Sequence, residues 1–170
     1  MLRALVVVAG VSGIAFCAAS YEPHPLAADA RADRIVVEKS ARKLTLFRGE
    51  TPLKSYSVAL GRAPEGTKER EGDHRTPEGH YIIDAHKYDS AFHRALHISY
   101  PTTADSVVAA QRGVKPGGDI MVHGIRNGLG WLGAFHRAID WTSGCIAVTD
   151  KEIEEIYRAV PDGTPIEMRP

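Results

Sequence analysis

Cysteine is scarce in this 170-residue sequence, which holds only Cys17 and Cys145. Cys17 lies inside an apolar run near the amino terminus, so removal of that run on export would leave Cys145 alone. A lone cysteine in an oxidising compartment indicates an intermolecular disulfide or a free reactive thiol. A buried cysteine that acts as a small hydrophobic residue is the plainer alternative.

Net charge is also lacking, because 21 Lys and Arg residues balance 21 Asp and Glu residues. Without a basic field, nucleic acid is excluded as a partner. The composition, 44% hydrophobic and 25% charged, is typical of one soluble globular domain. A glycine-rich polar stretch at 61–79 lacks the strand, Lys-Ser/Thr pair and helix of a phosphate-binding loop, so it is interpreted as a series of tight turns.

Metal-binding spacing is absent as well. His93 and His97 are four residues apart, but Arg94 stands where a zinc peptidase carries glutamate. No spacing supplies a third ligand, so no metal site is expected from these residues. Three further histidines are interpreted as surface or cleft-lining residues: His74, His80 and His86.

The longest hydrophobic run is too short for a typical membrane span. A positive MLR start, thirteen apolar residues at 4–16 and small residues at 18–20 predict an export signal over residues 1–20. An uncleaved anchor, which would tether the protein to the membrane, is the alternative, although spanning needs roughly twenty apolar residues. Phe16 before Cys17 disfavours a lipoprotein signal. The protein is therefore expected in the periplasm or cell envelope, with a linker at 21–33.

One domain is predicted over residues 34–170, with a mainly β fold and two short helices. Alternating or β-branched runs predict strands at 34–40, 43–49, 53–61, 80–86, 120–122 and 163–170, the first three as a meander. The helices are expected at 103–113 and 149–160. Thr149 and Glu152 form a capping-box pattern at the start of the second helix.

Cys145 and His123 are the candidate reactive residues. The run GGDIMVHG predicts a strand that ends at His123, where Gly124 lets the chain turn. A free thiol is only about three per cent ionised at neutral pH, and a nearby imidazole raises that fraction. In SGC, the N–H groups of Gly144 and Cys145 could face a developing oxyanion. A cysteine and a histidine alone remain a weak signal.

The sequence resembles the L,D-transpeptidase (YkuD-type) catalytic domain family. Its HG pair at 123–124 and TSGC at 142–145 match the family motif, and the resemblance extends upstream through SVALG and GTKEREGDHRTPEGHYII. It covers residues 34–170 and implies the family's β-sandwich or meander fold.

The resemblance also implies a reaction, which is acyl transfer on peptidoglycan stem peptides without metal or cofactor. Cys145 would attack the carbonyl that joins the third stem residue to D-Ala, and pass the acyl group to an amine. His123 would donate and accept the proton, Thr142 would supply the motif hydroxyl, and Gly144 with Cys145 would supply oxyanion amides. Family members also react with carbapenems through this thiol.

Two positions depart from the family pattern, because many members carry His and Arg where this chain has Ser143 and Ala147. The segment 127–141, between the two motif parts, is expected to shape the substrate cleft. Its candidate cleft residues are Trp131, Phe135, His136 and Trp141. Because His123 follows a strand whereas His136 lies in a loop, His123 is the expected base.

Three functions fit these residues. A peptidoglycan transpeptidase for wall crosslinking or remodelling is the leading hypothesis. An envelope amidase or peptidase would use the same Cys–His pair with water as acceptor. A non-catalytic wall-binding domain is disfavoured by the intact His, Gly and Cys of the motif.

The predicted signal gives a direct test. The exported protein should begin near Tyr21, because the small residues at 18–20 suit signal peptidase. Amino-terminal sequencing of protein recovered from the envelope measures this. A protein that still begins at Met1 would instead indicate an uncleaved anchor.

Overall fold

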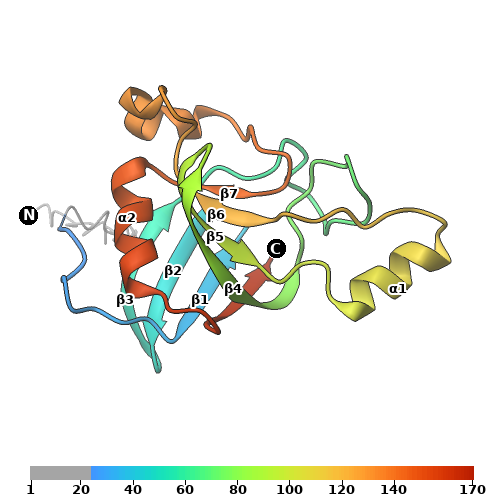
Figure 1. Ribbon diagram of the computed structural model, residues 1–170, viewed down its shortest axis with the longest axis horizontal. Helices are drawn as coiled ribbons and strands as arrows, with labels where there is room; N and C mark the ends of the chain where they lie inside the picture. The colour runs from blue at the N-terminus through green and yellow to red at the C-terminus, as the bar shows by residue number, and fades with distance from the viewer. Residues whose placement is uncertain (1–23) are drawn as a thin grey trace, which may run out of the picture.

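The computed structural model describes residues 24–170, and the expected signal at 1–20 lies outside the described residues. Eight strands form one mixed sheet in the order β3-β2-β1-β8-β4-β5-β6-β7 (Figure 1). The strands are β1 (Arg34–Glu38), β2 (Lys43–Arg48), β3 (Thr51–Ser57), β4 (Gly79–Ser90), β5 (His93–Ile98), β6 (Met121–His123), β7 (Ile146–Ala147) and β8 (Pro165–Arg169). The helices are α1 (Thr103–Gln111), α2 (Asp150–Ala159) and the 3-10 helix η1 (Gly130–Ala138).

The opening meander and the mainly β fold are confirmed. β1 pairs with β2 and β2 with β3, all antiparallel. Alternate side chains of β1 and β2, including Ile35, Val37, Leu44 and Leu46, are fully buried. The period of two along these strands therefore turns one face of the meander toward the core.

The longest strand, β4, joins the two halves of the sheet, and a bridge between the outer ends of the sheet closes it. The first part of β4, Gly79–Ile82, pairs with β8, whereas Ile83–Ser90 pairs with β5 through two irregularities in register. At the other ends of the sheet, Ala59 forms an isolated antiparallel bridge with Ala147 of β7. The closed sheet encloses a single apolar core to which strands from both halves contribute.

Helix α2 lies across the core between β3 and β5. Its capping box is formed by Thr149 and Glu152, as predicted, and Ile153, Ile156 and Ala159 are buried. The outer face of α2 makes polar contacts with both strands, because Glu154 accepts from Arg94 of β5 and Glu155 from Lys54 of β3. Helix α1 lies at the opposite end of the molecule and buries only Ala109 (Figure 1).

Residues 24–33, whose composition indicates a linker, instead lie against the domain. Leu26 is 8% exposed and belongs to the core cluster. Its N–H donates to Glu155 Oε1 at 3.1 Å, and the Ala32 N–H donates to the Ala159 carbonyl at 2.8 Å. The domain therefore includes a docked amino-terminal segment that hydrogen bonds to α2.

Three elements differ from the sequence prediction. The strand β5 was not predicted, the strand-like apolar run after Cys145 forms only the two residues of β7, and the segment expected as a loop contains the 3-10 helix η1. Both faces of β5 are covered in part, which removes the period of two from its sequence. Within residues 24–170, no helix is long and apolar enough to cross a membrane.

Glu155 generates a prediction about stability, because its carboxylate accepts from the Leu26 N–H, the Lys54 ammonium and the Tyr56 hydroxyl. Glu155→Ala leaves the Leu26 N–H and the Tyr56 hydroxyl without an acceptor, and leaves Lys54 with only the His24 carbonyl, so we expect a loss of about 2 kcal/mol in the free energy of unfolding. Urea denaturation measures it. Glu50→Ala, at a fully exposed glutamate, serves as the control and should change it by less than about 0.5 kcal/mol. Equal stability of the two variants would contradict this role of Glu155.

Candidate active site

The pairing of β6 with β7 brings the two candidate reactive residues together. The strands are parallel, with Val122 opposite Ile146 and His123 opposite Ala147. Cys145 immediately precedes β7, so this register places Cys145 and His123 on the same face of the strand pair. Both side chains line one cavity of about 960 Å³.

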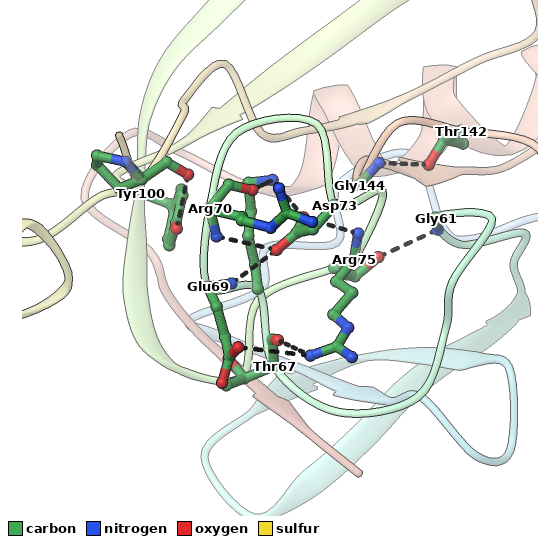
Figure 2. Close-up of polar contacts among 12 residues, drawn as sticks. Gly61, Thr67, Glu69, Arg70, Asp73, Arg75, Tyr100, Thr142 and Gly144 are labelled. Carbon is green, nitrogen blue, oxygen red and sulfur yellow. Dashed lines mark hydrogen bonds and ion pairs between the residues drawn. The ribbon is translucent and has the colours of Figure 1, made fainter. Parts of the chain in front are cut away.

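Thr142 holds the turn before Cys145. Its hydroxyl donates to the Cys145 carbonyl at 2.7 Å. The same hydroxyl accepts from the Gly144 N–H at 3.1 Å (Figure 2). The sequence suggested that the Gly144 N–H faces an oxyanion. In the structure it instead donates to the Thr142 hydroxyl within the turn. Among the hydrogen bonds of residues 24–170, none uses the Cys145 N–H, which remains the candidate oxyanion donor.

Gly144 is required by both conformation and space. Its φ of +131° is one that residues with side chains rarely adopt, and an added Cβ would lie 2.7 Å from the Arg75 carbonyl oxygen. The Gly61 backbone also lies directly against Gly144, because a Cβ on Gly61 would stand 3.1 Å from Gly144 Cα. The residue before Cys145 is therefore packed tightly against the backbone of Gly61 and Arg75.

The backbone beneath Gly144 belongs to residues 62–78, here termed the 62–78 loop. Figure 2 shows Asp73 at its centre, accepting from the N–H groups of Glu69, Arg70 and Arg75 at 2.7, 3.0 and 3.1 Å. The buried ammonium of Lys68 lies 2.8 Å from the same carboxylate. Burial opposes ionisation, but Lys68 and these N–H groups lower the pKa of Asp73 to about 2. The glycine-rich stretch is therefore an ordered support for the site.

His123 is held as a neutral base. Its Nδ1–H donates to the Gly124 carbonyl at 2.6 Å, which leaves the lone pair on Nε2. The ring is 3% exposed and lies against Phe92, with 4.5 Å between ring centroids. Burial lowers the pKa of His123 to about 4, although the Gly124 carbonyl opposes this.

The Cys145 thiol is also neutral at rest. It donates to the Asp119 carbonyl at 3.5 Å rather than to His123. Burial raises the pKa of Cys145 above its ordinary value, while the Met121 N–H partly offsets the rise. A thiolate paired with an imidazolium, suggested by the sequence, is therefore not the resting state. The thiol must lose its proton as it reacts, and His123 Nε2 can accept it.

Gly124 and Ser143 occupy different environments. The Gly124 N–H lies 3.1 Å from the Phe92 carbonyl oxygen, and an added Cβ would stand 2.8 Å from Asp150 Oδ1. Gly124 therefore allows close packing at the end of β6. Ser143 is exposed and lines the cavity. Ala147, where many family members carry arginine, is fully buried and offers the cavity no charge.

The 127–141 segment lines part of the cavity. His136 and Trp141 line the cavity, and the Trp141 indole N–H donates to His136 Nδ1 at 3.4 Å. Burial, followed by Arg137, lowers the pKa of His136 to about 4. Trp131 is 79% exposed and is not among the cavity-lining residues. The apolar lining from this segment consists of Leu129, Leu132, Phe135, Ala138 and Ile139.

His93 and His97 each pair with a carboxylate outside this cavity. His93 Nε2 lies 2.7 Å from Glu154, and His97 Nδ1 lies 2.6 Å from Asp84. In the described part of the chain, no group of three or more His, Cys, Asp and Glu side chains is arranged to hold a metal. Sequence reasoning missed Phe92, Asp119 and Arg62, which line the cavity but carry no motif signal.

Comparison with known proteins identifies relatives of this chain. A family model for the L,D-transpeptidase catalytic domain (YkuD) matches residues 32–168. YafK of Escherichia coli (strain K12), a curated protein provisionally assigned as an L,D-transpeptidase, is 30% identical over 133 residues. That match covers 74% of this chain but 46% of YafK, so the chain spans about half the length of this relative.

Solved structures show the same fold. The helical cell shape determining protein Pgp2 from Campylobacter jejuni matches with a TM-score of 0.62 and 22% identity, over 83% of this chain and 48% of Pgp2. Bd1075 of Bdellovibrio bacteriovorus gives 0.56 and 23%, over 85% and 50% of the two chains. An L,D-transpeptidase from Mycobacterium smegmatis gives 0.54 and 16%, over 82% and 59%.

The geometry predicts unequal roles for the two histidines. His123→Ala removes the strand-held base, so acylation of Cys145 should slow by at least about a hundredfold. His136→Ala loosens Trp141 and should weaken substrate binding by roughly tenfold or less. Rapid-quench mass spectrometry over a range of substrate concentrations measures both the acylation rate and the strength of substrate binding. Loss of acylation in His136→Ala, with near wild-type acylation in His123→Ala, would reverse the assignment.

The same site predicts a pH profile. His123 is a free base at neutral pH, and it loses this role only as the pH falls through its pKa of about 4. Acylation at subsaturating substrate should therefore stay level from pH 7 to about pH 5 and then decline. Unfolding must be followed by circular dichroism over the same range. A decline centred near 6.5, with the fold intact, would show that His123 is not held neutral by burial.

Proposed function

The chain belongs to the L,D-transpeptidase catalytic domain family, and from this premise we propose that it transfers acyl groups on peptidoglycan stem peptides through a Cys145 thioester. The main support is the placement of Cys145 and His123 on one face of β6 and β7, open to the same cavity. A nucleophile and its base must share such a space if one carbonyl group is to reach both.

Acylation begins with attack of Cys145 Sγ on the carbonyl carbon that joins the third stem residue to D-Ala. The thiol proton passes to His123 Nε2, and the oxyanion receives the Cys145 N–H. As the tetrahedral adduct collapses, the carbon–nitrogen bond breaks and His123 returns its proton to the departing amine. D-Ala leaves, and the thioester remains on Cys145.

Deacylation reverses these roles. An amine of a second stem peptide attacks the thioester carbonyl, and His123 takes the amine proton. Collapse expels the Cys145 sulfur, which recovers its proton from His123. The product carries a new amide bond, so the net reaction exchanges one amine for another without an external energy source.

Cleft composition favours an amine over water as the acceptor. The side of the cavity formed by the 127–141 segment is apolar, with Leu129, Leu132, Phe135 and Ile139 among its lining residues. A bound peptide would complete this wall and limit the access of water to the thioester. We propose transfer as the main reaction, and an exported location in the periplasm or cell envelope.

A carbapenem tests the nucleophile. Its strained β-lactam carbonyl should acylate one thiol, giving a single covalent adduct that peptide mapping places on Cys145. Cys145→Ala is the matched control and should remain unmodified. An adduct that persists in this variant would remove Cys145 as the nucleophile.

Defined muropeptides test the reaction. Wild-type protein incubated with a disaccharide tetrapeptide should release D-Ala and form crosslinked dimers, which mass spectrometry detects. D-Ala exchange in the presence of labelled D-amino acid would also support acyl transfer. Release of tripeptide alone, without dimer or exchange, would mean that water is the acceptor.

A further inference from the structure

Arg62 is fastened to the segment that leads to Cys145. Its N–H donates to the Thr142 carbonyl at 3.1 Å, and its side-chain Nε donates to the Trp141 carbonyl at 3.2 Å. The preceding residue, Gly61, lies against the Gly144 backbone. Both the main chain and the side chain of Arg62 are therefore fixed close to the nucleophile, and Arg62 lines the same cavity.

The charge of Arg62 has no carboxylate partner within residues 24–170. Other arginines near the site are neutralised: Arg42 pairs with Asp140 at 2.9 Å, and Arg137 pairs with Glu152. The single side-chain hydrogen bond of Arg62 goes to a carbonyl oxygen through Nε. Its two terminal nitrogens keep their donors, in the planar fork that fits a carboxylate.

The other cations of the cavity are less suited to this role. Lys87 lies 3.8 Å from Asp119, which offsets part of its charge. Arg126 is exposed, as Arg62 is, but no side-chain hydrogen bond within the described chain fixes the Arg126 guanidinium. Ala147 of β7 carries no charge. Ala59 forms a bridge with Ala147, and the chain continues from Ala59 to Arg62 three residues later.

We propose that Arg62 is the carboxylate-binding residue of this site, and that it holds a carboxylate of the peptide whose carbonyl Cys145 attacks. The proposal rests on the proposed function for the identity of the peptide. Stem peptides offer two such groups near the scissile bond, the α-carboxylate of the terminal residue and the side-chain carboxylate of a diamino acid at the third position. Bidentate binding would orient the carbonyl over Cys145.

Kinetics with matched peptides test the pairing. Arg62→Gln should raise KM about tenfold for a tetrapeptide with both carboxylates free, with little change in kcat. Arg62→Lys keeps the charge but loses the planar pair of donors, so its KM should lie between those of the wild type and Arg62→Gln. Arg48→Gln, at an exposed arginine on β2, controls for net charge. The same KM measurements with peptides amidated at one carboxylate or the other complete a double-mutant-type cycle between Arg62 and each carboxylate.

Coupling decides the outcome. Amidation of the carboxylate that Arg62 binds should weaken wild-type binding and cause no further loss in Arg62→Gln. Three results would overturn the assignment. The first is that the losses from Arg62→Gln and from amidation add strictly at both carboxylates. The others are an unchanged KM in Arg62→Gln, and coupling to amidation in Arg126→Gln in place of Arg62→Gln.

A binding measurement separates this proposal from the reaction. Calorimetry with Cys145→Ala protein, with and without Arg62→Gln, measures affinity for the same peptides when no chemistry occurs. Arg62-dependent binding without wild-type turnover would uphold the carboxylate site and refute the proposed reaction. Turnover with Arg62-independent binding would refute only the carboxylate site, and no binding at all would refute both.

Discussion

The site depends on a contact between two stretches of backbone that leave no room for side chains. Gly61 and Gly144 lie against each other, and Gly144 also lies against the Arg75 carbonyl of the 62–78 loop. This contact fixes how closely the turn before Cys145 packs against the backbone of Gly61 and Arg75. The same contact brings the strand extension at 59–61 beside β7, so the closure of the sheet and the position of Cys145 have one origin.

Burial sets the chemistry of the reactive pair more than their mutual attraction does. The Gly124 carbonyl fixes the proton on Nδ1 of His123, and desolvation keeps both the imidazole and the thiol uncharged. At rest the His123 imidazole and the Cys145 thiol each donate a hydrogen bond to a backbone carbonyl, so neither depends on the other as a hydrogen-bond partner. The arrangement favours proton transfer during attack over a preformed ion pair.

Local sequence signals were sufficient for the elements whose pattern is local. The β1–β3 meander follows from alternating apolar residues, and α2 from the Thr149–Glu152 capping box. The motif located Cys145 and His123, which the structure places at one cavity.

Features set by distant residues could not be predicted in this way. The 24–33 segment docks because Glu155, about 130 positions away, accepts the Leu26 N–H. The Gly144 N–H was expected to be free, but Thr142 takes it up, and Trp131 lies outside the cavity lining because the η1 helix exposes its side chain. Protonation states depend on burial, which only the assembled fold determines.

The raised pKa of the Cys145 thiol also affects its sensitivity to oxidation. Peroxides and disulfides react with thiolates, so a thiol that stays protonated is attacked slowly by both. Sulfenic acid formation and mixed disulfides with other proteins are slowed in the same way. Within residues 24–170 Cys145 has no second cysteine that could resolve such damage, so its protonated state is its main protection.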